Sequence, residues 1–140
     1  MVTIEEKKQE LRRYRLLLKR IERKEQERRR WLELGTTITP IYSDMPKAQN
    51  TSNKVEQAGI ACAQIAEELS QDICELTKEK RHIERAIRSV EDKKLRLILE
   101  KHYIDGMTFE KIAEDMYFSE RQIRRLHLKV LGEMSFNVRR

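Results

Sequence analysis

Residues 108–131 read TFEKIAEDMYFSERQIRRLHLKVL, and this stretch decides the fold. It begins with Thr108, whose hydroxyl is well suited to cap the N-terminus of a helix. The apolar residues that follow recur at helical spacing, which places them on one buried face: Phe109, Ile112, Ala113 and Met116. The pattern therefore predicts a short helix that ends before the pair Tyr117-Phe118.

A second short helix is predicted after a tight turn. Ser119 is followed three residues later by Gln122, which is the spacing of a capping box. The inner stripe of this helix is Ile123, Leu126, Val130 and Leu131, and the basic residues on its other faces are Arg121, Arg124, Arg125 and Lys129. Two helices joined in this way are typical of a helix-turn-helix, in which the second helix offers its N-terminal end to the major groove of DNA.

The same stretch resembles the helix-turn-helix of sigma factor region 4, the part that reads promoter DNA. The resemblance lies in the order T-F-E-x-I-A-E-x-M, then S-E-R-Q-I-R-R-L, then K-x-L. One position departs from the pattern, because most such motifs have glycine at the first residue of the turn, where φ is positive. Tyr117 stands there in this chain, which predicts either a strained backbone or a different turn.

The resemblance implies which side chains touch DNA. Arginine is the commonest reader of guanine, glutamate accepts from cytosine, and glutamine pairs with adenine. Hydroxyl groups and backbone N–H groups at helix N-termini hold phosphates. The DNA-binding residues expected on this basis are Thr108, Ser119, Glu120, Arg121, Gln122, Arg124, Arg125 and Lys129.

The resemblance extends over nearly the whole chain. A long basic helix, the segment ITPIYSDMP, a second long helix and Y-I-D-G-M-T-F precede the motif in that order. This order is similar to an uncharacterised family of phage and prophage proteins, which neighbours the ArpU and RinA regulators of late phage genes. The resemblance implies a transcriptional regulator, most simply an activator of late or packaging genes.

Composition favours long, solvent-exposed helices over a compact sheet. Of the 140 residues, 39% are charged and only 4 are glycine and 2 proline. Residues 1–34 hold 12 basic and 7 acidic side chains, so most of the net charge of +6 lies on the N-terminal segment. A basic segment fits a polyanionic partner, and the run Arg28-Arg29-Arg30 could bind phosphate, but a solvated helix end is the favoured interpretation of this run.

Two long helices are predicted ahead of the motif, at about residues 3–34 and 54–90, with Gly35 ending the first. An unbroken seven-residue repeat runs through the second helix: Val55, Cys62, Leu69, Leu76, Ile83 and Val90. The fold class is therefore all-α: a long antiparallel, coiled-coil-like helical hairpin over residues 1–90, with a linker at 35–53. A C-terminal three-helix domain containing the helix-turn-helix follows over 91–140, and its first helix is expected at 91–105.

Other kinds of site find little support in the sequence. Cys62 and Cys74 lack the spacing of zinc ligands, and His82, His102 and His127 each stand alone on a different helix turn. No metal, cofactor or catalytic residue is expected. The sequence has no signal peptide and no apolar run long enough for a membrane, which favours a protein of the bacterial cytoplasm without a membrane partner.

The sequence leaves several functions open. A DNA-binding regulator that dimerises or contacts RNA polymerase through its hairpin is the leading hypothesis. A small terminase-like packaging protein shares the same parts, and a partner of sigma factor or polymerase that never touches DNA is a third. An enzyme such as a serine recombinase would need a catalytic domain, but only helical hairpin precedes the motif.

Overall fold

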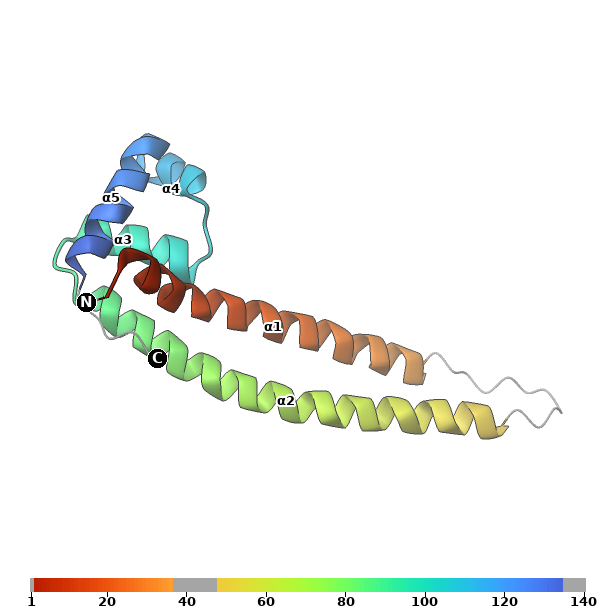
Figure 1. Ribbon diagram of the computed structural model, residues 1–140. Helices are drawn as coiled ribbons and strands as arrows, with labels where there is room; N and C mark the ends of the chain where they lie inside the picture. The colour runs from red at the N-terminus through yellow and green to blue at the C-terminus, as the bar shows by residue number, and fades with distance from the viewer. Residues whose placement is uncertain (1, 37–47, 135–140) are drawn as a thin grey trace. The chain divides into compact units, whose positions relative to one another are not determined.

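The computed structural model describes residues 2–36 and 48–134. All regular elements in these two ranges are helical, which confirms the predicted all-α class. They are α1 (Ile4–Thr36), α2 (Ala48–Arg88), α3 (Lys93–Leu99), the π-helix η1 (Glu100–Ile104), α4 (Phe109–Met116) and α5 (Glu120–Glu133) (Figure 1). The segment ITPIYSDMP and the C-terminal Arg139 and Arg140 lie outside the described residues.

The ends of the long helices differ from the sequence prediction. Gly35 does not terminate α1, because the helix runs on to Thr36, whose hydroxyl donates to the carbonyl oxygens of Leu32 at 2.9 Å and Glu33 at 3.2 Å. The second helix begins at Ala48, not at about residue 54. The polar residues 49–53 continue the helix because no glycine or proline interrupts them.

Two compact units divide the chain, and one of them is residues 19–75. Within it α1 and α2 run antiparallel, since Lys24 contacts Asp72 at 2.6 Å whereas the carbonyl of Arg28 accepts from the thiol of Cys62 at 3.7 Å. The seven-residue repeat is unevenly buried: Leu69 is 7% exposed but Val55 is 45% exposed. A helix of 3.6 residues per turn drifts away from a strict seven-residue row, which explains the difference.

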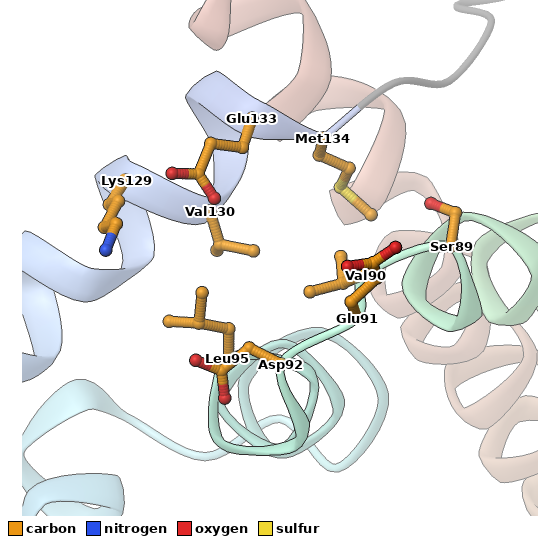
Figure 2. Close-up of a pocket in the computed structure, with 9 residues that line it drawn as sticks. All are labelled: Ser89, Val90, Glu91, Asp92, Leu95, Lys129, Val130, Glu133 and Met134. Carbon is orange, nitrogen blue, oxygen red and sulfur yellow. The ribbon is translucent and has the colours of Figure 1, made fainter.

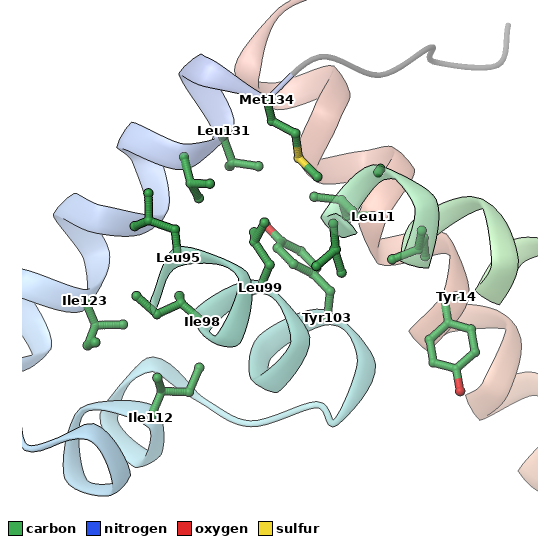
Figure 3. Close-up of a cluster of buried hydrophobic side chains, with 14 of the residues drawn as sticks. Leu11, Tyr14, Leu95, Ile98, Leu99, Tyr103, Ile112, Ile123, Leu131 and Met134 are labelled. Atoms are coloured by element: carbon green, nitrogen blue, oxygen red, sulfur yellow. The ribbon is translucent and has the colours of Figure 1, made fainter. Parts of the chain in front are cut away.

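The other compact unit comprises residues 2–18 and 76–134 of the described chain. Its hydrophobic core draws on α1 and α2 as well as on the short helices (Figure 3). Leu11 and Tyr14 come from α1, and Ile83 and Ile87 come from α2. The short helices supply most of the remaining core: Leu95, Ile98, Leu99, Tyr103, Ile112, Ile123, Val130, Leu131 and Met134.

The helix predicted over 91–105 changes type halfway. Asp92 caps α3 as a carboxylate that accepts from the backbone N–H of Lys94 at 2.9 Å. From Glu100 the backbone becomes a π-helix, and the N–H of Asp105 donates to the carbonyl of Glu100 at 3.0 Å. Gly106 then reverses the chain with a φ of 74°, in the region that favours glycine.

Candidate nucleic-acid interface

Helix α4 begins and packs as its sequence predicts. The hydroxyl of Thr108 accepts from the backbone N–H of Lys111 at 3.2 Å and so caps the helix. Ile112 and Ala113 are buried in the core, while Phe109 and Met116 pack partly buried against it. Thr108 itself is exposed, so its side chain is both a helix cap and a surface group.

The turn between α4 and α5 adopts the strained form that the sequence left open. Tyr117 has a φ of 59° and a ψ of 40°, and it is the one non-glycine residue with positive φ in the described chain. The turn is closed by the backbone N–H of Phe118, which donates to the carbonyl of Ala113 at 3.0 Å. The Tyr117 side chain is 95% exposed, so packing within its compact unit does not explain this conformation.

Helix α5 starts with the predicted capping box. The backbone N–H of Gln122 donates to the Ser119 hydroxyl at 3.2 Å, and the backbone N–H of Ser119 donates to Oε1 of Gln122 at 3.0 Å. Both side chains are exposed, but each is already hydrogen-bonded within the capping box. Pairing of Gln122 with adenine would therefore use its amide nitrogen, or would require the box to open.

The solvent face of α5 carries cations in a row. Arg121, Arg125 and Lys129 are exposed and lie four residues apart, which is about one helical turn. Neither Arg121 nor Arg125 forms an ion pair with any carboxylate of the described residues. The opposite face is anchored in the core, where Ile123 and Val130 are 0% exposed. The arginines therefore project from a firmly packed helix.

Arg124 lies at the edge of this row and is held in place. Its Nη2 and Nε atoms donate to Oε1 of Glu120 at 2.8 and 3.1 Å, one turn earlier on the same helix. Its guanidinium also lies over the ring of Phe109 on α4, 5.1 Å from the centroid. Glu120 and Arg124 therefore form one fixed unit, with side chains that are 47% and 60% exposed.

Two histidines that the sequence placed on unrelated helix turns meet beneath Arg124. His102 of η1 stacks on Phe109 with ring centroids 4.2 Å apart, and its ring lies 5.6 Å from that of His127 on α5. The Tyr103 hydroxyl lies 2.6 Å from Nε2 of the buried His127, as expected when the phenol donates to an unprotonated nitrogen. The contact between Tyr103 and His127 could not be predicted from sequence spacing, because 24 residues separate them.

Burial sets the charge of this cluster. Desolvation, aided by the positive charges of Lys8, Arg12 and Arg124, lowers the pKa of His127 to about 3. Desolvation also lowers the pKa of His102, and it raises that of Tyr103. Both histidines are therefore neutral at physiological pH and act as packing groups.

Lys129 differs from the two unpaired arginines in its surroundings. It lines a cavity of about 420 Å³ between the C-terminal end of α5 and the α2–α3 connection (Figure 2). Four apolar side chains and three carboxylates line the cavity: Val90, Leu95, Val130 and Met134, with Glu91, Asp92 and Glu133. Phosphate is less well accommodated near these carboxylates than near Arg121 and Arg125.

Of the eight predicted DNA-binding residues, all are exposed, and seven lie in or next to α5. Within the described ranges, no group of three or more histidine, cysteine, aspartate or glutamate side chains could hold a metal ion. The same ranges contain no helix with the length and apolar character needed to cross a membrane. Three of the exposed residues on α5 are arginines, so this surface presents guanidinium groups to solvent.

The fold and this surface define an all-helical protein with a short, arginine-bearing helix at its C-terminal end. The family model described as "Protein of unknown function (DUF1492)" matches residues 47–132, and the chain belongs to this family. The match covers α2 to α5 and leaves out α1. No curated protein and no solved structure matches the chain.

Proposed function

We propose that α4 and α5 form a helix-turn-helix, similar to that of sigma factor region 4, which binds double-stranded DNA. The observation on which this proposal rests is that Arg121 and Arg125 are exposed and unpaired, one turn apart on a helix whose other face packs into the core. Bidentate guanidinium groups at this spacing are suited to neighbouring base edges in a major groove. The N-terminal half of α5 enters the groove, since its cations Arg121 and Arg125 form no ion pair with a carboxylate of the described residues.

The remaining site residues have supporting roles in this proposal. The helix N-termini capped by Thr108 and Ser119 hold backbone phosphates through their N–H groups. The fixed Glu120–Arg124 unit flanks the reading arginines and contacts a base edge or a neighbouring phosphate. Lys129 contributes long-range attraction, because nearby carboxylates reduce its value as a direct phosphate ligand.

The biological role that we propose is regulation of transcription in a phage or prophage. The resemblance to sigma factor region 4 and to the ArpU and RinA group supports activation of late or packaging genes. In this proposal the protein is a non-enzymatic regulator in the bacterial cytoplasm. The antiparallel pair of α1 and α2 serves as a hairpin arm that forms a homodimer or contacts RNA polymerase, while the three-helix domain reads the promoter.

Selection of bound sequences from random duplex DNA tests this function. The purified full chain should enrich one short motif, and a duplex carrying that motif should outcompete a scrambled duplex in a gel-shift assay. The double variant R121A/R125A, at fixed salt, should lose the preference while keeping the helical circular dichroism spectrum. Capture of RNA polymerase without any shift of DNA would instead identify a polymerase-binding partner and overturn the proposal.

Light scattering separates the regulator from a packaging protein. A dimer presents two reading helices to a repeated or palindromic site, as regulators with this motif do. A ring of about eight or more subunits would favour the terminase-like alternative, in which DNA binding serves packaging.

A further inference from the structure

The first turns of α1 carry cations next to the proposed reading helix. Lys8, Arg12 and Arg15 follow one another at intervals of four and three residues, so they line one side of α1. Two contacts fix this part of the helix within its compact unit. The ammonium of Lys7 donates to the carbonyl of Leu131 in α5 at 2.7 Å, and the guanidinium of Arg15 donates to the carbonyl of Ile104 in η1 at 3.3 Å.

Arg12 lies between these two anchors, and its side chain is exposed. Arg124 lies over the ring of Phe109, which stacks on His102. In agreement with this geometry, positive charge on Arg12 and on Arg124 lowers the pKa of both His102 and His127. Cations from the first turns of the chain and from its last helix therefore converge on one side of this compact unit.

Arg12 is the least compensated of these cations. Lys8 pairs with Glu5 at 3.1 Å, and Arg124 pairs with Glu120 at 2.8 Å. Arg12 has no ion pair with a carboxylate in the described parts of the chain. His127 beneath is buried and His102 is half-buried, and both are neutral, so the surface there keeps a local excess of positive charge that includes the exposed guanidinium of Arg12.

We propose that Arg12 binds a backbone phosphate of the same duplex that α5 reads. This inference rests on the proposed function. Phosphate strands flank both edges of the major groove, so a cation beside the reading helix meets one of them when the helix enters the groove. A guanidinium binds phosphate through two parallel N–H donors, and such a contact is independent of sequence.

The inference gives α1 a part in DNA binding that the family match does not include, since that match begins at residue 47. The basic helix α1 then contributes directly to the proposed interface. Arg12, in the first turns of α1, supplies a phosphate contact. The hydrogen bonds of Lys7 and Arg15 hold these turns in place.

Fluorescence anisotropy of the full chain with labelled duplexes, titrated at several salt concentrations, tests this inference. Arg12→Ala should weaken binding several-fold and to the same extent on the selected motif and on a scrambled duplex. It should also reduce the slope of log affinity against log salt by about one, because one phosphate contact is lost. Arg12→Lys should recover part of the affinity, since it keeps the charge.

Arg23→Ala is the matched control, because it removes an exposed arginine from the same helix in the other compact unit. If Arg12→Ala and Arg23→Ala have the same affinity and salt slope as the unaltered chain, while Arg125→Ala loses sequence preference, the inference is wrong and the proposed function stands. If the unaltered chain binds neither duplex, the proposed function fails and this inference fails with it.

Discussion

The ammonium group of Lys7 bonds the carbonyl oxygen of Leu131 at 2.7 Å, although 124 residues separate them in the sequence. The same ammonium bonds the carbonyl of Met134, also at 2.7 Å. Carbonyls at the end of a helix have no partner within the helix and carry partial negative charge. A buried lysine from α1 therefore caps the C-terminus of α5 and ties the two ends of the described chain together.

Replacement of this lysine should destabilise the compact unit that contains α5. We expect Lys7→Met to lower the free energy of unfolding by about 1–3 kcal/mol, because two buried carbonyls lose a charged donor. Urea denaturation followed by circular dichroism measures the change. Lys19→Met, at an exposed position of the same helix, should change the value by less than about 0.5 kcal/mol. Equal unfolding free energies for the two variants would contradict this role of Lys7.

The turn before α5 offers a stabilising substitution. Tyr117 has a left-handed backbone that costs a non-glycine residue about 1–2 kcal/mol, and its exposed side chain packs on nothing that would offset this cost. Tyr117→Gly should raise the free energy of unfolding by about 0.5–1 kcal/mol after the entropy of the unfolded glycine is subtracted. Tyr117→Ala retains a Cβ and should bring no such gain in the same denaturation experiment. Equal stability of the glycine and alanine variants would show that the backbone is unstrained.

Local features of the fold could be predicted from the sequence because their causes are local. The caps at Asp92 and Thr108 and the box formed by Ser119 and Gln122 each depend on residues at most three positions apart. Local reasoning was wrong at Gly35, because α1 continues to Thr36. A glycine inside a helix costs only about 1 kcal/mol, so it does not force the helix to end. The inner stripe of α5 was predicted without His127, because a histidine is not normally counted as a core residue.

Long-range contacts could not be predicted, since they depend on how the helices pack. Neither the cap that Lys7 places on α5 nor the pairing of His102 with His127 leaves a spacing pattern in the sequence. The sequence also gave no reason to separate Lys129 from the arginines of α5. Only the fold brings Glu91 and Asp92 to the cavity that Lys129 lines.

The buried histidine of α5 should make the fold sensitive to acid. Burial lowers the pKa of His127 from the usual value of 6.5 to about 3, so between these values the unfolded chain binds a proton that the folded chain does not. The contribution of His127 to the free energy of unfolding is fully present above pH 6.5. It falls as the pH decreases, by up to about 1.4 kcal/mol per pH unit. Unfolding free energies measured from pH 7 to pH 4 report this loss.

His127→Gln supplies the control for the acid effect, because glutamine can still bond the Tyr103 hydroxyl but does not titrate. The variant should show a shallower dependence of unfolding free energy on pH, whatever its stability at pH 7. The partly buried His102 remains in both proteins and adds the same residual slope to each. Parallel curves for the two proteins would mean that His127 protonates as readily in the folded state as in the unfolded one.

Substitution of Arg125 tests whether α5 reads the DNA sequence. Arg125 is exposed, unpaired within the described chain, and in the second turn of α5, so we expect Arg125→Ala to weaken specific DNA binding by about 1–3 kcal/mol. Lys129→Ala, one turn further and beside Glu133, should weaken binding less and without changing sequence preference. Gel-shift titrations on the selected motif and a scrambled duplex at one salt concentration separate the two effects. Unchanged affinity of the Arg125 variant for the motif would remove this residue from the interface, and a larger loss at Lys129 would move the reading surface toward the C-terminal end of α5.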